Sequence, residues 1–395
     1  MNRKYNQILD RLIQHIESEE FRGYDPYDIL NASFPFRFFG TYFSAVATQL
    51  HKRNPINFRP LLGIKKDYNP KALGLLVYAY SGLQQLRPNV DYEPQLLRLI
   101  ELLRQKRSPG YSGACWGYNF AWASPGKFLP AFAPSGVVTS FVAKGLFSFY
   151  RLTGQQEAKE LLVSAAEFVD KDLAVTQMES GICISYTPFQ RDCCYNASLL
   201  AAEVLAMAYS LNGNEAYRKK AVDAVRFVIT KQHSDGRWNY SLNEHTGAER
   251  TQIDFHQGYV IDSIIAIQQL TGVKVAGADE AVIKGLAFYQ NQQFISTGQS
   301  LWRFPAKYPV DIHHQSQGII TFSKHKKMMP VNNSSAGSFA HSITDWTINN
   351  LFDAKKGYFY YRKYPLFTNK IPYIRWSNAW MMVALVELLS IQRED

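Results

Sequence analysis

The chain has 395 residues, of which 46% are hydrophobic, 14% aromatic and only 19% charged, a composition that excludes intrinsic disorder and provides a large apolar core. An excess of 43 Lys and Arg over 33 Asp and Glu gives a net charge of +10, which favours anionic partners. The longest cluster of basic residues, at 324–327, is short, so we expect no nucleic acid partner.

The first segment, residues 1–21, places apolar residues at helical spacing among charged ones, which predicts an amphipathic helix rather than a signal peptide. No stretch of about 18 apolar residues occurs, so we expect no membrane span and, by default, a cytoplasmic location. The four cysteines form no Cys-x-x-Cys pair and are interpreted as buried free thiols: Cys115, Cys183, Cys193 and Cys194.

Three helical segments end in a glycine at a constant spacing of 59 residues (213 − 154 and 272 − 213), at Gly154, Gly213 and Gly272. A glycine directly after the last apolar residue marks a helix C-terminus. Each helix is apolar nearly all round, and a charge-rich helix follows it, predicted at 155–170, 215–232 and 278–292. Helices of the first type are buried, and their amphipathic partners cover them.

Short segments of glycine and alternating aromatic residues follow the second helices and predict short strands or extended loops, at 115–118, 181–186, 235–240, 301–304 and 357–361. Further inner helices are expected to start near Pro70, Ser135, Asp311 and Pro372. The repeating unit of about 60 residues fits six times into the chain, and stacking buries faces that one hairpin cannot cover. The sequence therefore predicts an all-α (α/α)6 toroid forming one domain over residues 1–395, with an open solenoid as the alternative.

In such a toroid the loop before each inner helix delivers side chains to one rim. These positions share a pattern of Asp, then Tyr or His, then Asn or Gln. Helix capping explains an Asp there, but it does not require imidazole. We therefore predict the catalytic groups among six residues: Asp192, Tyr195, Asp254, His256, His313 and His314.

Other polar and aromatic residues of the rim are candidates for holding substrate. Arg191, Asn196, Gln257, Arg375 and Trp376 flank the predicted catalytic groups. Asp25 and Asp28 lie in a segment dense in aromatic and polar residues, where capping is the alternative. Trp116 and Tyr118 would form a stacking platform for sugar rings, although a role in the core is equally consistent with their pattern.

Imidazole and carboxylate groups suit zinc or manganese, so His256, His313 and His314 with an Asp form a conceivable metal site. The chain has no His-Glu-x-x-His or other tight ligand spacing. We therefore expect no metal and no cofactor.

The ring of hairpins with aromatic inter-repeat loops resembles the six-hairpin glycosidases and polysaccharide lyases. The segment 23–31 together with Trp116-Gly117-Tyr118 is similar to uncharacterised proteins encoded among bacterial polysaccharide biosynthesis genes. Glucuronyl C5-epimerases and uronate lyases of related architecture use Tyr or His to transfer protons and Arg or Asn to hold a carboxylate. The resemblance thus implies such roles for Tyr195, His256, His313 or His314, and for Arg191, Asn196 and Arg375.

These observations favour an enzyme of polysaccharide biosynthesis that modifies or cleaves an anionic, uronate-containing glycan or a lipid-linked precursor by proton abstraction. A base, an acid and a cation for the carboxylate are all present among the rim residues. Two alternatives remain open. One is a glycoside hydrolase that uses two of Asp25, Asp28, Asp192, Asp254 and Asp311 as acid and base; the other is a non-catalytic glycan-binding or scaffold protein.

Overall fold

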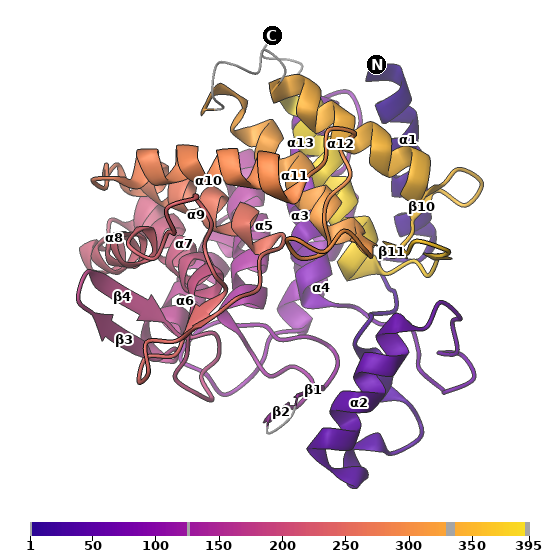
Figure 1. Ribbon diagram of the computed structural model, residues 1–395, viewed down its shortest axis with the longest axis horizontal. Coiled ribbons are helices and arrows are strands. Elements are labelled where there is room, and N and C mark those ends of the chain that lie inside the picture. Colours follow the sequence, from indigo (N-terminus) through magenta and orange to yellow (C-terminus); the bar gives the residue numbers. More distant parts are fainter. Residues whose placement is uncertain (1, 125–126, 329–335, 392–395) are drawn as a thin grey trace.

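In the computed structural model, which describes residues 2–124, 127–328 and 336–391, an inner and an outer layer of helices form a ring (Figure 1). The inner helices are α3 (Pro70–Leu86), α5 (Gly136–Thr153), α7 (Tyr195–Asn212), α9 (His256–Thr271), α11 (Ile312–Lys324) and α13 (Ala379–Ile391). Each packs against an outer helix, in the same order α4 (Glu93–Gln105), α6 (Gln156–Lys171), α8 (Glu215–Ile229), α10 (Ala278–Gln293), α12 (Ala336–Leu351) and α1 (Asn2–Ser18).

The ring is closed by the two ends of the chain. Each inner helix contacts the next, the last inner helix α13 packs against the first, α3, and the N-terminal helix α1 packs on the outside of α13. The (α/α)6 toroid is therefore confirmed, and the open solenoid is wrong. The last unit is assembled from both termini, which the 59-residue repeat alone does not reveal.

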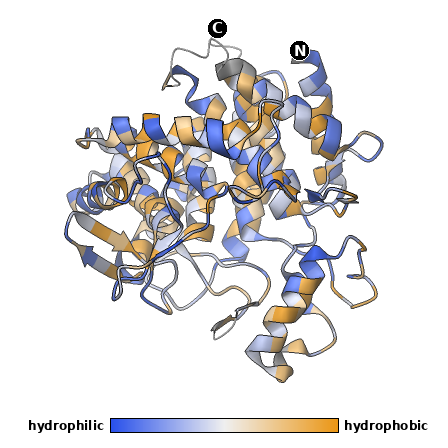
Figure 2. Ribbon diagram, viewed as in Figure 1, coloured by the Kyte–Doolittle hydropathy of each residue, from blue (hydrophilic) through white to orange (hydrophobic). Residues whose placement is uncertain are grey.

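The predicted helix ends are also found where the glycines are. Gly154, Gly213 and Gly272 follow α5, α7 and α9 with φ values of 71°, 70° and 67°, in the left-handed region that favours glycine. The inner helices are buried nearly all round, whereas outer helices such as α10 alternate hydrophobic and hydrophilic residues (Figure 2). All four cysteines are buried and free.

Small residues set the closest approach within the inner layer. A Cβ atom on Gly74 of α3 would lie 2.6 Å from the Phe141 carbonyl oxygen and 2.7 Å from the Val142 Cα of α5. A Cβ on Gly145 would in turn meet the Gly74 carbonyl oxygen at 2.5 Å. The backbones of α3 and α5 are therefore in direct contact at this crossing.

Short antiparallel strands connect the units at the end of the ring where the inner helices begin. β3 (Val175–Met178) pairs with β4 (Gly181–Ile184), and β9 (Phe352–Asp353) pairs with β10 (Tyr358–Phe359). Two three-stranded sheets are formed by β5 (Cys193–Cys194), β6 (Ser241–Leu242) and β7 (Glu249–Arg250), and by β8 (Val310–Asp311), β11 (Arg362–Lys363) and β12 (Thr368–Asn369). Of the segments predicted as short strands or extended loops, 235–240 and 301–304 form loops.

One segment departs from the repeat. Between α1 and α3 the chain forms the 3₁₀ turns η1 (Asp28–Asn31) and η2 (Phe36–Phe39) and the helix α2 (Gly40–Arg53), which projects from the ring (Figure 1). The hairpin β1 (Trp122–Ser124) with β2 (Lys127–Leu129) packs beside α2. Within the described ranges, no helix has the length and apolar character needed to cross a membrane.

Candidate active site

At the start of α9 a carboxylate holds a histidine ring. Asp254 Oδ1 lies 2.5 Å from His256 Nδ1 and accepts the backbone N–H of His256 at 3.2 Å. Burial alone would raise the pKa of Asp254, but the His256 ring outweighs it and the pKa is lowered. The carboxylate is therefore ionised and accepts from Nδ1–H. The His256 side chain is 18% exposed, and its Nε2 atom is left to accept a proton.

A second histidine of the rim is paired with a tyrosine. The Tyr259 hydroxyl lies 2.6 Å from His313 Nε2, and both side chains are buried. Burial, with help from the positive charge of Lys71, lowers the pKa of His313 well below its usual value, and burial raises the pKa of Tyr259. At neutral pH both groups are therefore uncharged, and the tautomer of His313 decides whether the phenol or the imidazole N–H is the donor. His313 Nδ1 is buried without a hydrogen-bond partner among the described residues.

Aromatic rings join the two histidines into one site. The Phe255 ring stacks on His313 with a centroid separation of 4.2 Å and lies equally close to His256. Trp376 and Trp380 contact the other sides of His313 at 4.9 and 4.6 Å. We call these rings the rim cluster: Phe255, His256, Tyr259, His313, Trp376 and Trp380.

A buried lysine lies against the rim cluster. The Lys71 ammonium group, in the first turn of α3, is 4.1 Å from the centroid of the Phe141 ring, 5.3 Å from that of Trp380 and 5.7 Å from that of Tyr259. Burial lowers its pKa well below the usual value. Aromatic faces stabilise the cation only in part, so an anion bound beside Lys71 would favour its charged form.

Buried ion pairs surround the rim cluster. Arg375 donates to both oxygens of Asp25, with distances of 2.5 Å from Nε and 2.8 Å from Nη2. Arg59 Nε lies 2.8 and 2.9 Å from the two oxygens of Asp28. The two carboxylates that we predicted to bind substrate therefore already hold arginines, and the charge of Arg375 is balanced within the protein.

A third pair fixes the orientation of Trp376, which lies with Arg375 in η4 (Ile374–Asn378), a single turn of π-helix before α13. Asp311 accepts the indole N–H of Trp376 at 2.8 Å with one oxygen and the Arg362 Nε–H at 2.7 Å with the other. These contacts hold the Trp376 ring against His313.

Two predicted catalytic residues pack against the outer layer, although the His314 ring also meets the edge of Phe255 of the rim cluster, with a centroid separation of 6.4 Å. The Tyr195 hydroxyl donates to Glu249 at 2.5 Å, and its ring packs on Phe227 of α8. His314 stacks on Tyr289 of α10, and burial lowers its pKa to about 4. Both side chains are buried among structural contacts.

Three further predicted residues lie around the start of α7, where local contacts hold two of them. Asp192 accepts the backbone N–H of Tyr186 at 2.8 Å and so shapes its own turn. Asn196 accepts from the Cys194 thiol at 3.1 Å, whereas Arg191 is exposed on the surface. None of the three contacts the rim cluster through an interaction of the described residues.

The hydrogen bonds of Gln257 explain why an Asn or Gln recurs in the pattern of the rim. Its Oε1 accepts the backbone N–H of Trp238 at 3.1 Å and so ties an aromatic inter-repeat segment to the inner helix. The same kind of hydrogen bond, from a backbone N–H of the loop to a side-chain oxygen, recurs in other units: from Trp116 to Thr139, Ile184 to Ser198, Ser300 to Gln315 and Phe359 to Asn378. The polar residue in the first turns of the inner helices thus positions the loops of the rim.

The two residues of the predicted stacking platform are separated. Trp116 is fully buried, and its indole N–H donates to the Leu103 carbonyl at 2.8 Å, so it belongs to the core. Tyr118 is half-buried and stacks on Phe120, and the Arg375 guanidinium lies 4.7 Å from the centroid of its ring. Only Tyr118 is therefore placed beside the ion pairs of the rim.

No protein-family model matches the sequence, and no curated protein is significantly similar to it in sequence. Solved structures do match. A cellobiose 2-epimerase from Bacillus thermoamylovorans has a TM-score of 0.66 at 14% identity, over 82% of this chain and 88% of the epimerase. The chain shares its fold with sugar-converting enzymes.

Two further structures have the same architecture. A glycoside hydrolase family 76 α-mannanase from Bacteroides thetaiotaomicron has a TM-score of 0.60 at 14% identity, covering 82% of this chain and 87% of the mannanase. An unsaturated glucuronyl hydrolase specific for heparin has a TM-score of 0.63 at 12% identity, covering 99% and 97%. The predicted likeness to toroid glycosidases and epimerases is thus confirmed for the fold.

The described residues of this toroid contain no group of three or more His, Cys, Asp or Glu side chains arranged to hold a metal ion. The rim histidines are separated by aromatic rings, because Phe255 lies against both His256 and His313. Nδ1 of His256 contacts a carboxylate and Nε2 of His313 contacts a phenol, two groups that can exchange protons with imidazole.

Sequence reasoning missed several residues of the site, above all Lys71, Tyr259 and Arg59. Lys71 carried a signal, because it is a cation in the first turn of an otherwise apolar inner helix. Tyr259 lies one turn after His256, on the same face of α9. Arg59 had no signal of its own, since its partner Asp28 is 31 residues away in an irregular segment.

Proposed function

We propose that this protein is a carbohydrate-active enzyme that abstracts the proton next to the carboxylate of a uronate residue in an anionic glycan or a lipid-linked precursor, as an epimerase or a lyase. The observation that carries the proposal is the Asp254–His256 pair beside the Tyr259–His313 pair in one aromatic cluster. The fold shared with a cellobiose 2-epimerase and a glucuronyl hydrolase, together with the net charge of +10, supports it.

His256 is the base in this proposal. Its Nδ1–H donates to ionised Asp254, so the lone pair on Nε2 accepts the proton from the carbon next to the carboxylate. The C–H electron pair moves into the carboxylate as an enolate. Lys71 supplies the nearby positive charge that stabilises this anion, and a substrate carboxylate would favour its protonated form.

Tyr259 is the acid. Burial raises the pKa of its hydroxyl, so the phenol is protonated at neutral pH, and neutral His313 orients it. In an epimerase, Tyr259 returns a proton to the opposite face of the enolate carbon. In a lyase, the enolate electrons expel the substituent on the neighbouring carbon, and Tyr259 protonates the leaving oxygen. Exchange with solvent then removes the proton from His256 and restores that of Tyr259.

The hydrolase alternative has less support. An acid for glycosidic cleavage needs a carboxyl with a raised pKa, whereas the pKa of Asp254 is lowered and Asp25, Asp28 and Asp311 are bound to arginines. A non-catalytic binding protein would need the aromatic surface but has no use for a carboxylate that orients a histidine.

The experiment uses the purified chain in D2O with a panel of glucuronate- and mannuronate-containing polysaccharides. Proton NMR follows loss of the signal of the carbon-bound hydrogen next to the carboxylate, and ultraviolet absorbance follows an unsaturated product. We expect His256→Gln to lower the rate about 10²- to 10⁴-fold and Tyr259→Phe to lower product formation. His245→Gln, whose side chain is 86% exposed, is the matched control and keeps full activity.

Retention of activity in His256→Gln would overturn the role of that base. If Asp254→Asn instead abolished the release of reducing ends while His256→Gln did not, the hydrolase would be the correct reading. Binding of a uronate glycan without deuterium incorporation or any product would establish the binding protein.

A further inference from the structure

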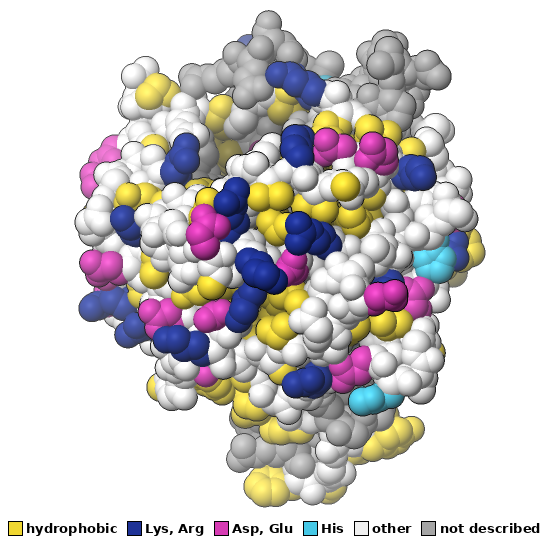
Figure 3. Space-filling model, turned by 90° about the vertical axis from the view of Figure 1, so that its left-hand side faces the viewer, with side chains coloured by type: hydrophobic (Ala, Val, Ile, Leu, Met, Phe, Trp, Pro, Cys, Tyr) yellow, Lys and Arg dark blue, Asp and Glu magenta, His cyan; other side chains and the backbone are white. Residues whose placement is uncertain are grey.

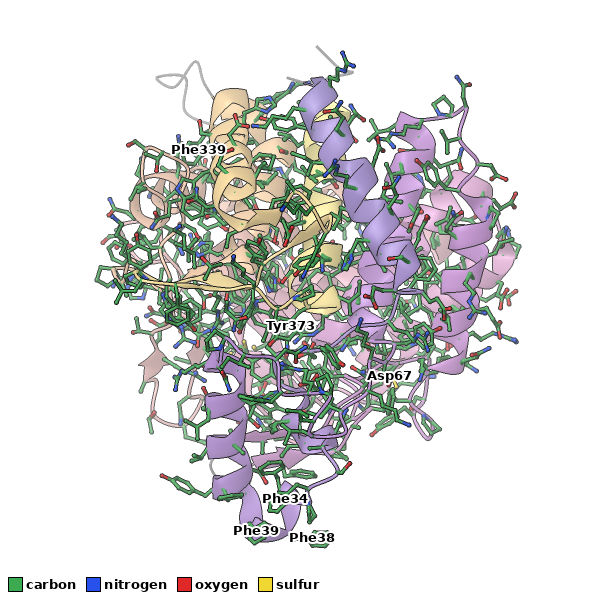
Figure 4. All side chains as sticks on the ribbon, turned by 90° about the vertical axis from the view of Figure 1, so that its right-hand side faces the viewer. Phe34, Phe38, Phe39, Asp67, Phe339 and Tyr373 are labelled. Carbon is green, nitrogen blue, oxygen red and sulfur yellow. The ribbon has the colours of Figure 1, made fainter. Side chains whose placement is uncertain are left out.

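The segment from Ala32 to Lys66, which we call the lobe, extends beyond the repeats of the toroid. It contains η2 and α2 and leaves the ring between α1 and α3. Phe34, Phe38 and Phe39 lie at its outer end, far from Tyr373 at the base of η4 (Figure 4). The lobe is therefore a projection with an aromatic tip.

The amphipathicity of α2 is inverted. The residues that it buries are small or polar, namely Ser44, Ala45 and Thr48. Its large apolar residues face outward, with Tyr42 72% and Leu50 67% exposed. A helix that faces water normally does the opposite.

Other apolar side chains of the lobe extend this exposed surface. Phe38 is 76% exposed and Leu61 84%, and Phe34, Phe39, Phe43, Ile56 and Phe58 are also exposed. The tip rings pack on one another, with Phe34 stacked on Phe39 at 5.5 Å and Phe39 against Phe43 at 5.4 Å. Hydrophobic side chains also project from this lower end of the molecule in Figure 3. Exposed apolar side chains gathered on one projection in this way mark an interaction site.

The charge of the lobe has a single sign. Its sequence contains no Asp or Glu, but six basic residues: Arg37, Lys52, Arg53, Arg59, Lys65 and Lys66. Arg59 is bound to Asp28 and Lys66 to Glu19, whereas Arg53 and Lys65 are exposed. The face of the ring shown in Figure 3 instead carries basic and acidic residues side by side. The surface that complements the lobe is apolar and anionic.

We propose that the lobe docks on an anionic membrane surface with α2 lying along that surface, its exposed apolar side chains in the interface between headgroups and acyl chains and its basic residues at the lipid phosphates. Exposed aromatic and basic residues on one helix are the features of interfacial membrane binding. A second copy of this chain fits less well, because a symmetric contact would bring two lobes of the same charge together.

The base of the lobe touches the residues that surround the candidate active site. Lys52 Nζ lies 3.5 Å from the Tyr27 hydroxyl, and Arg59 donates to the Asp25 carbonyl at 2.7 Å. Tyr27 in turn contacts Trp376 of the rim cluster. Docking therefore places the rim near the membrane, where a lipid-linked glycan would be presented. The docking itself does not depend on the proposed reaction.

The test is flotation of the full chain with vesicles of phosphatidylglycerol and phosphatidylcholine, compared with pure phosphatidylcholine. The wild type is expected to float with the anionic vesicles, and added salt is expected to weaken binding. The triple variant Phe38→Ser, Tyr42→Ser, Leu61→Ser is expected to bind at least tenfold more weakly. The matched control Leu97→Ser, Ile283→Ser removes half-exposed apolar residues from α4 and α10 and is expected to bind like the wild type.

Unchanged circular dichroism and melting temperature establish that the variants are folded. A second variant, Arg53→Glu, Lys65→Glu, leaves the aromatic tip intact and is also expected to lose binding to anionic vesicles. The proposal is overturned if the wild type does not float, or if both lobe variants float as the wild type does. A dimer that the triple variant abolishes, without vesicle binding, would replace the membrane by a second copy.

Discussion

Replacing Asp25 by Asn tests how the ring is closed, because it removes the negative partner of the buried Arg375 guanidinium. The two residues are 350 positions apart and hold each other through two hydrogen bonds. Removing one member of a buried pair costs about 3–5 kcal/mol, since the other charge stays desolvated. With about 2.1 cal/mol/K of unfolding entropy per residue over 395 residues, the melting temperature should fall by about 4–6 °C.

Thermal unfolding followed by circular dichroism measures this shift. The control is Asp345→Asn, which breaks an ion pair with Lys4 whose side chains are 42% and 48% exposed. Such a pair contributes at most about 1 kcal/mol, so the control should shift the melting temperature by about 1 °C or less. A double variant, Asp25→Asn with Arg375→Met, should recover part of the loss because no charge is left unpaired. Equal shifts for Asp25→Asn and the control would refute the reasoning.

Three other predictions concern the ring itself. Burial lowers the pKa of His314 to about 4, below its unfolded value near 6.5. The contribution of the neutral ring to stability is therefore complete above pH 6.5 and is lost as the pH falls toward 4. In melting curves recorded at a series of pH values, His314→Gln should reduce the fall of the melting temperature between pH 6.5 and 4. Gly74→Ala should destabilise by about 1–3 kcal/mol in urea unfolding, because its Cβ would strike the backbone of α5, whereas Gly136→Ala, with its nearest neighbour at 3.2 Å, should cost less. Gln315→Leu removes hydrogen bonds to Ser300 N, Gly298 O and Thr347 Oγ1 and should cost about 2–4 kcal/mol; a loss below about 0.5 kcal/mol would contradict the role of these loop ties.

The period of the fold could be read from the sequence because it depends on local signals. A helix ends where a glycine permits a left-handed residue, and an inner helix has apolar residues on every side because neighbours surround it. Both signals repeat at Gly154, Gly213 and Gly272. The lobe has no such signal, since its helix buries small polar residues and exposes aromatic ones.

The candidate site was predicted only in part because a sequence pattern gives position but not direction. Successive residues of a helix point about 100° apart. His313 therefore faces the rim cluster while His314, its neighbour, stacks on Tyr289 of the outer layer. The same geometry turns Tyr195 toward Phe227. Equivalent positions in a repeat share a backbone environment. The rotation of each helix about its own axis decides which of their side chains meet.

Closure of the ring and formation of the rim depend on the same contacts. The backbone of Tyr24 forms a β-bridge with that of Tyr373, and Asp25 binds Arg375. The segment before the first inner helix is therefore fixed to the turn before the last inner helix. That turn also holds Trp376 against His313. A chain that had not joined its ends would lack one wall of the rim cluster, even with every hairpin formed. The geometry of the rim cluster therefore requires the contacts of longest sequence separation, which is why the repeats alone did not reveal it.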